Sequence, residues 1–153
     1  MAEIVIYTDG GARGNPGPAG AGVAAYEGEL SPHSSSSGQA NSGQVKRLFE
    51  LKKFLGEKRT NNWAEYEALA LALTEAKRRG LAKRGIEVRM DSELIVRQLN
   101  DEYQVKEETL WPQYMKVHNL LVAHFPDIRI VHVRREENKE ADRLVNEAID
   151  SAS

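Results

Sequence analysis

The stretch IVIYTDGG, residues 4–11, decides how this 153-residue sequence is interpreted. It begins with β-branched and aromatic residues, which are typical of a buried strand, and it ends with an aspartate followed by two glycines. We therefore predict a strand over residues 3–8 that ends at Asp9. A carboxylate at the end of a buried strand is costly unless a cation or hydrogen bonds compensate it. The end of this strand is thus the first candidate for a functional site.

The composition indicates one domain over residues 1–153. Hydrophobic residues make up 41% of the chain, which is enough for a core, and no apolar run reaches the ~18 residues of a membrane span. The absence of cysteine excludes disulfide scaffolds and thiolate metal sites and is compatible with a reducing cytoplasm, where we expect the protein. The net charge of −2 gives no general sign of nucleic-acid binding, although residues 46–59 and 77–85 are basic on balance.

The rest of the sequence predicts a mixed sheet covered by helices. Strands are expected at 3–8, 19–28, 86–90 and 127–134, with a turn at 11–18, and helices at 60–80, 91–101, 108–125 and 136–150. Thr60 or an asparagine after it is expected to cap the helix at 60–80, and Thr109 the helix at 108–125. Trp111 is expected in the core, and Trp63 either in the core, which is favoured, or at the edge of the site. Segment 44–56 fits a helix or a strand, with strand favoured for part of it. The Ser-rich segment 30–43 is interpreted as a mobile loop.

Four acids are candidates for a shared site. Asp9 and Asp91 each follow a strand, and if these strands are parallel neighbours the two carboxylates meet at one edge of the sheet. Glu65 and Asp142 lie near the starts of two helices that could lean over the same edge. Each acid also has an ordinary explanation as a turn residue, a cap, a helix-dipole partner or an exposed helix acid. Together the carboxylates would repel one another strongly unless a cation neutralised them. Oxygen ligands favour Mg²⁺ or Mn²⁺ over Zn²⁺, and two such ions could share the four acids.

Four segments together resemble type 1 ribonuclease H: YTDGGARGNPGPAG (7–20), TNNWAEYEAL (60–69), MDSELIVRQLN (90–100) and ENKEADRLVNEA (137–148). The resemblance implies an α/β fold with a five-stranded mixed sheet, in which strands one to three are antiparallel and strands one, four and five are parallel. Segment 44–56 would then be the third strand. The resemblance also implies an endonuclease that cuts the RNA strand of RNA–DNA hybrids with two metal ions. Such an enzyme leaves 5′-phosphate and 3′-hydroxyl ends and has little sequence preference.

The resemblance also assigns roles to residues. The metal ligands and catalytic acids would be Asp9, Glu65, Asp91 and Asp142, holding two Mg²⁺ ions, or Mn²⁺ as a substitute, once substrate is bound. The substrate-binding residues would be Gly10, Gly11 and Asn15 at the minor groove, Asn62 and Ser92 at RNA 2′-hydroxyls, and Thr60 at a DNA phosphate.

Two features depart from the family pattern. Many relatives carry a histidine in the loop before the last helix, but residues 133–138 have none, and Arg135 is the expected stand-in. A guanidinium stays protonated, so Arg135 would attract phosphate and help product release without acting as an acid or base. The basic insert of some relatives is absent from residues 99–111, which are acidic on balance. We expect a monomer that binds no membrane.

Three other interpretations stay open at this stage. The chain could be a different nuclease on the same fold, such as a transposase or a junction resolvase. It could be a non-catalytic member that binds hybrids or proteins. It could also be a mixed α/β domain whose acids only cap helices and turns.

Overall fold

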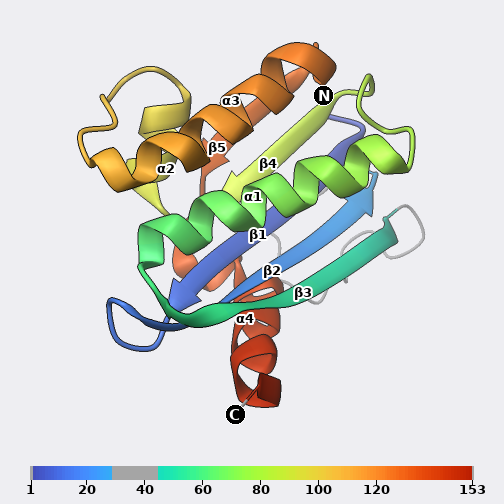
Figure 1. Ribbon diagram of the computed structural model, residues 1–153. Coiled ribbons are helices and arrows are strands. Elements are labelled where there is room, and N and C mark those ends of the chain that lie inside the picture. The colour runs from blue at the N-terminus through green and yellow to red at the C-terminus, as the bar shows by residue number, and fades with distance from the viewer. Residues whose placement is uncertain (1, 29–44, 153) are drawn as a thin grey trace.

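The structure, a computed structural model, describes residues 2–28 and 45–152 (Figure 1). The predicted mobile loop at 30–43 lies outside the described residues. The elements are β1 (Ile4–Ala12), β2 (Gly17–Glu27), β3 (Lys46–Arg59), α1 (Asn61–Arg78), β4 (Ile86–Met90), α2 (Glu93–Leu99), the 3₁₀ turn η2 (Glu108–Leu110), α3 (Trp111–His124), β5 (Ile128–His132), the 3₁₀ turn η3 (Arg135–Glu137) and α4 (Lys139–Ala152).

The five strands form one sheet in the order β3-β2-β1-β4-β5. Strand β1 pairs antiparallel with β2, and β2 pairs antiparallel with β3, whereas β1, β4 and β5 are parallel neighbours. This is the predicted mixed sheet, and residues 46–56 of the segment 44–56 lie in the third strand, as the resemblance implied. Because β1 and β4 are parallel and adjacent, their carboxyl ends point to the same edge of the sheet, as predicted.

Helices cover the two faces of the sheet unequally. On one face α1 lies across the strands and α3 lies beside it, as Figure 1 shows, and the main core forms between α1 and strand residues such as Ile4, Ile6 and Val88. Helix α4 packs on the other face, against Val5 and Tyr7 of β1 through Ala141. The acids on α1 and α4 therefore approach β1 from opposite sides.

Helix α4 also lies unusually close to β2. A Cβ at Gly22 would be only 2.3 Å from the Ala141 backbone oxygen, so this position requires glycine. Strand residue Asp9 is paired with Gly22, and Ala141 is followed by Asp142. The close packing thus brings the start of α4 next to Asp9.

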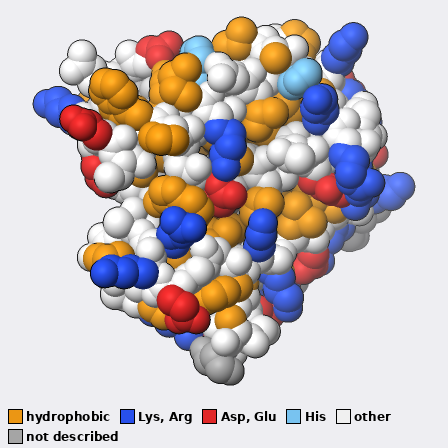
Figure 2. Space-filling model, in the orientation of Figure 1, with side chains coloured by type: hydrophobic (Ala, Val, Ile, Leu, Met, Phe, Trp, Pro, Cys, Tyr) orange, Lys and Arg blue, Asp and Glu red, His pale blue; other side chains and the backbone are white. Residues whose placement is uncertain are grey.

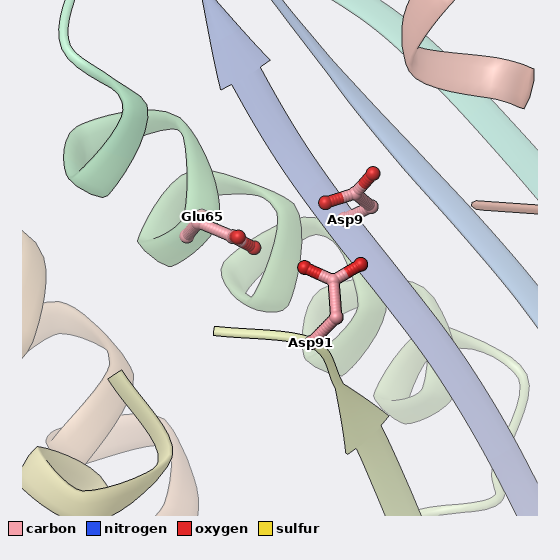
Figure 3. A group of neighbouring side chains, drawn as sticks. All are labelled: Asp9, Glu65 and Asp91. Carbon is pink, nitrogen blue, oxygen red and sulfur yellow. The ribbon is translucent and has the colours of Figure 1, made fainter. Parts of the chain in front are cut away.

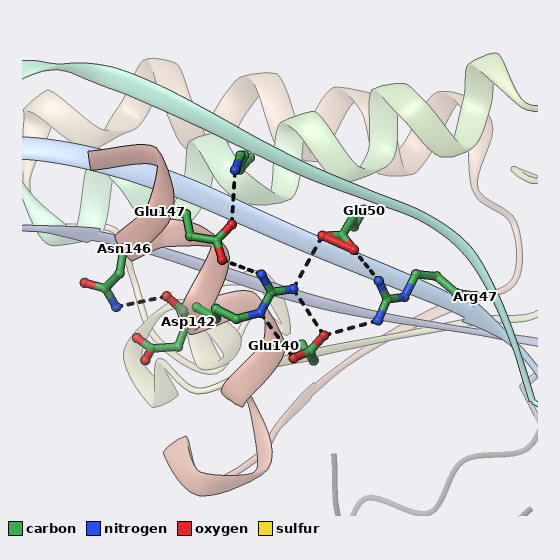
Figure 4. A network of polar contacts seen from close by, with 8 residues as sticks. Arg47, Glu50, Glu140, Asp142, Asn146 and Glu147 are labelled. Atoms are coloured by element: carbon green, nitrogen blue, oxygen red, sulfur yellow. Dashed lines mark hydrogen bonds and ion pairs between the residues drawn. The ribbon is translucent and has the colours of Figure 1, made fainter. Parts of the chain in front are cut away.

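Ion pairs tie the outer side of α4 to β3. Arg143 lies among Glu50, Glu140 and Glu147, and Arg47 bridges Glu50 and Glu140 (Figure 4). Asp142 is not part of these ion pairs. Its backbone oxygen accepts a hydrogen bond from the Asn146 side chain in the same view. The arrangement leaves the Asp142 carboxylate exposed.

Three local predictions are wrong. Strand β1 does not end at Asp9 but continues to Ala12, because β2 still pairs with it there, at Ala19. Thr109 does not cap α3; its hydroxyl donates to Glu107, and the helix begins after the 3₁₀ turn η2. Trp111 is 55% exposed, because it starts α3 on the outer side, where its indole N–H donates to Val105 O.

Apolar side chains gather over α2, the segment after it and the start of α3, as Figure 2 shows on the face seen in Figure 1. The exposed ones include Leu94, Tyr103, Trp111 and Met115. Elsewhere on this face basic and acidic side chains are interspersed (Figure 2). No helix in the described parts of the chain combines the length and the apolar character needed to cross a membrane.

Candidate active site

The two aspartates meet because of the register between β1 and β4. The parallel pairing runs to Thr8 beside Met90, and each of these residues is followed by an aspartate, Asp9 or Asp91. Strand β4 ends there, while β1 runs on. Asp9 is therefore held inside a paired strand and is only 7% exposed, whereas Asp91 lies half-buried at a strand end.

Helix α1 brings Glu65 to the same place. The Thr60 hydroxyl accepts a hydrogen bond from the Trp63 backbone N–H, which confirms the predicted N-cap and starts the helix. One turn later Glu65 is 6% exposed and accepts the Gly10 N–H at 3.2 Å. Figure 3 shows the carboxylates of Glu65, Asp9 and Asp91 converging from α1, β1 and the end of β4. One oxygen from each lies within 4.8 Å of the other two.

The carboxylates perturb each other strongly. Burial, followed by the charges of Asp91 and Asp142, raises the pKa of Asp9 from its ordinary value of 3.8 to about 8. Burial and the charges of Asp9 and Asp91 likewise raise the pKa of Glu65 well above its ordinary range. In both cases Arg135 acts in the opposite direction but does not compensate. The protein alone thus leaves a cluster of acids without sufficient positive charge.

Asp142 and Arg135 complete the rim of the site. Both line a cavity of about 350 Å³, together with the three clustered acids. Asp142 is exposed and forms a hydrogen bond with Asp9 that contributes to the raised pKa of Asp9. The four predicted catalytic acids and the predicted arginine are therefore brought to one cavity.

The predicted substrate-binding residues divide into two groups. Gly10, Gly11, Asn62 and Ser92 line the cavity, but Asn15 and Thr60 are not among its lining residues. The Asn15 Oδ1 accepts the Asn61 N–H at 3.0 Å, and the Thr60 hydroxyl accepts the Trp63 N–H at 3.2 Å. Both side-chain oxygens are thus engaged in holding the first turn of α1.

Sequence reasoning missed three residues around the site. Asn61 lines the cavity and accepts the Ala12 N–H at 2.8 Å, so it joins β1 to α1. Arg13, also in the lining, pairs with Asp150 at 2.6 Å and holds the turn against α4. Asn138 is 1% exposed and donates to Asp91 at 3.0 Å. No pattern in the sequence indicates these contacts, because each depends on how elements distant in the sequence pack together.

The residues at this edge fit a hard divalent cation. The donors are carboxylate oxygens, which suit Mg²⁺ and Mn²⁺, and the part of the chain described here offers no thiolate, since the sequence lacks cysteine. Asp9, Glu65 and Asp91 would hold such an ion, because their oxygens already converge. Burial, and after it the repulsion between the acids, raises the pKa of Asp9 and of Glu65, and a bound cation would offset both effects by favouring the charged carboxylates.

Comparison with known proteins agrees with this geometry. The family model described as reverse transcriptase-like matches residues 8–148. The crystal structure of LC11-RNase H1 in complex with RNA/DNA hybrid has a TM-score of 0.81 and 45% sequence identity, covering 97% of this chain and 98% of that chain. The structure of RNase H1 from the halophilic archaeon Halobacterium salinarum has a TM-score of 0.80 and 34% identity, covering 97% and 98% of the two chains.

Two curated relatives are longer than this chain. Ribonuclease HI of Halobacterium salinarum is 35% identical over 98% of this chain, which corresponds to 66% of that protein. The bifunctional protein Rv2228c of Mycobacterium tuberculosis is 36% identical over 99% of this chain, which spans only 36% of its length. The match covers nearly the whole chain in sequence and in fold. The chain therefore belongs to the reverse transcriptase-like family, and its sequence and structure group it with the type 1 ribonucleases H.

Proposed function

We propose that the chain is an endonuclease that hydrolyses the RNA strand of RNA–DNA hybrids, using two divalent cations when substrate is bound. The observation that carries this proposal is that one carboxylate oxygen each of Asp9, Glu65 and Asp91 lies within 4.8 Å of the others, where β4 ends beside β1. The similarity to LC11-RNase H1, which was solved with an RNA/DNA hybrid, supports the choice of substrate. Products with 5′-phosphate and 3′-hydroxyl ends are expected.

The protein's own residues would position the reacting groups. Bound Mg²⁺ or Mn²⁺ would supply the Lewis acid that neutralises charge on the scissile phosphate and activates water. Asp9, buried and fixed in β1, and Glu65, fixed by Gly10 N–H, form the rigid part of the acidic cluster. Asp142, exposed at the rim, can adapt its side chain when a phosphate enters.

Arg135 would contribute charge rather than proton transfer. It is exposed, lines the cavity and already interacts with Asp9 and Glu65 through its charge. Since a guanidinium stays protonated, its proposed role is to attract the phosphate backbone and weaken the hold on the product. It takes the place that a loop histidine has in many relatives.

Selection for RNA would come from short polar groups around the cavity. Asn62 and Ser92 line it and would contact 2′-hydroxyls, which are the groups that distinguish RNA from DNA. Ser92 also caps α2, since its hydroxyl accepts the Ile95 N–H. Contacts to sugar and phosphate carry no base information, so we propose cleavage with little sequence preference.

A panel of labelled substrates tests the proposal. Hybrid, single-stranded RNA, double-stranded RNA and double-stranded DNA are incubated with the protein in Mg²⁺ or Mn²⁺, with EDTA as the negative control. The expected result is cleavage of the RNA strand of the hybrid in metal and no cleavage in EDTA. Preferential cleavage of double-stranded DNA would instead indicate a nuclease of another kind on the same fold. Intact substrates throughout, beside an active control enzyme, would contradict the proposal.

A further inference from the structure

Asn138 occupies an unusual position between η3 and α4. Its side chain is buried, and its Nδ2 donates two hydrogen bonds, one to the Thr8 backbone oxygen at 2.9 Å and one to Asp91 Oδ2 at 3.0 Å. The two acceptors define the amide orientation, because a flipped amide would place its oxygen against two other oxygens. The single amide group therefore joins β1 to the end of β4.

The backbone of Asn138 also takes part in the site. Its carbonyl oxygen accepts the Asp142 N–H at 3.1 Å, which closes the first turn of α4. Asn138 is thereby connected to three of the four acids. It contacts Asp91 directly, it binds the residue before Asp9, and it starts the helix turn that carries Asp142.

The other end of the amide argues against a purely stabilising role. Within the described residues, Asn138 Oδ1 is buried and has no hydrogen-bond partner. A buried acceptor without a partner costs free energy, so the oxygen end of the amide does not account for an asparagine at this position. The feature of asparagine that is used here is its pair of N–H donors.

We infer that Asn138 is a positioning residue, which orients the Asp91 carboxylate for the cation while leaving its negative charge intact. The inference deepens the proposed function, since it concerns the cation site on which hydrolysis would depend. A lysine or arginine at this position would also hold Asp91, but its charge would compete with the cation. A neutral amide donates the hydrogen bond without that competition.

The test compares Asn138→Leu with Asn100→Leu. Leucine keeps the shape of asparagine and removes its donors. Asn100 is the matched control, since its side chain donates to a backbone oxygen, Ile130 O at 3.0 Å, and it does not line the acidic cavity. Binding of Mg²⁺ or Mn²⁺ alone is measured by titration calorimetry on the full chain, next to the melting temperature in metal-free buffer.

The inference predicts that N138L loses affinity for the cation, and that a loss of folding stability alone, as in N100L, does not have this effect. N138L should bind the cation about 10-fold or more weakly at a temperature at which it is fully folded, as is typical when a residue that orients a ligand is lost. Its melting temperature should fall, as that of N100L should, because Thr8 O and Asp91 lose a hydrogen-bond donor. N100L should bind the cation like the wild type. If N138L does not melt cooperatively, Asn138→Ala is measured in its place, with the same expectation. Cation binding of N138L, or of that replacement, equal to the wild type would overturn the inference, as would a wild type that binds neither cation.

Hydrolysis of the hybrid separates this inference from the proposed function. If the wild type binds the cation, N138L binds it more weakly and no hybrid is cut, the positioning role stands and the proposed activity fails. If the wild type cuts hybrid and N138L needs no more Mg²⁺ for half its maximal rate, the activity stands and the positioning role fails.

Discussion

At the scale of single residues, Gly10 and Gly11 follow the same aspartate but meet different surroundings. A Cβ on Gly10 would be 2.2 Å from the Ala64 backbone oxygen, whereas the nearest atoms to a Cβ on Gly11 are 3.9 Å away. Gly10 is therefore required by the packing of α1 on β1. Gly11 has no such packing requirement, so the absence of its Cβ would serve instead to let a nucleic-acid backbone come close at the minor groove, where the resemblance places it.

The two glycines should consequently respond differently to the same substitution. Gly10→Ala forces α1 away from β1 and should lower the free energy of unfolding by about 2 kcal/mol or more, as overpacking does. Gly11→Ala should fold with nearly the wild-type stability but bind hybrid more weakly. Denaturant unfolding and the KM for hybrid measure the two effects. Equal stability of the two variants would show that the contact between α1 and Gly10 is not tight.

At the scale of elements, the sequence was most informative where a pattern is local. Strand β4 has the predicted bounds, 86–90, and Thr60 is the predicted cap of α1. The segment of β3 was ambiguous because β3 lies at the edge of the sheet. Only Phe49 and Leu55 of this strand are buried, so apolar and polar residues do not alternate clearly along it.

The residues of the site also differ in how far the sequence predicts them. The four acids could be predicted because Asp9 and Asp91 come directly after apolar runs, Glu65 and Asp142 lie near predicted helix starts, and the resemblance assigned all four to one metal site. Asn138 could not be predicted, since its donors meet Thr8 and Asp91 only after η3, β1 and β4 have packed together. Trp111 was placed in the core because tryptophan is commonly buried, but its position at the start of α3 leaves it exposed.

The ion pairs between α4 and β3 should contribute little stability. Arg143 and its carboxylate partners are partly exposed, and such pairs contribute about 0–1 kcal/mol each. We expect Arg143→Ala to lower the free energy of unfolding by about 1 kcal/mol at low salt and by less in ~1 M salt, where the charges are screened.

Arg97→Ala provides the comparison, because Arg97 pairs with Glu93 and Glu102 and not with residues of β3 or α4. Denaturant unfolding at two salt concentrations measures both variants. A loss of several kcal/mol that persists in high salt for Arg143→Ala would mean that this arginine holds α4 by packing rather than by charge.

At the scale of the whole molecule, the acidic cluster makes the metal-free protein sensitive to pH. The pKa of Asp9 is raised from 3.8 to about 8, so between these values the native state binds more protons than the unfolded state. The stability from this group is fully present below about pH 4 and is lost as the pH rises through 8. Glu65, whose pKa is also raised, acts in the same direction.

Asp9→Asn should therefore stabilise the metal-free protein at pH 8, by about 2–4 kcal/mol, and flatten the dependence of stability on pH. Millimolar Mg²⁺ should stabilise the wild type and not the variant, since a cation neutralises the cluster. Thermal unfolding between pH 5 and 9, with and without Mg²⁺, measures both effects. A lower melting temperature for the variant at pH 8 would contradict the picture of uncompensated charges.

The most direct test of the account is the cleavage of an end-labelled RNA–DNA hybrid by the wild type and by Glu65→Gln in Mg²⁺. The central claim is that carboxylates from α1, β1 and the end of β4 form one cation site that hydrolyses RNA. The substitution keeps the shape of Glu65 and removes one charge, so the account predicts cleavage by the wild type and a rate slower by ~100-fold or more for the variant. Equal rates for the two proteins, or no cleavage by the wild type, would contradict it.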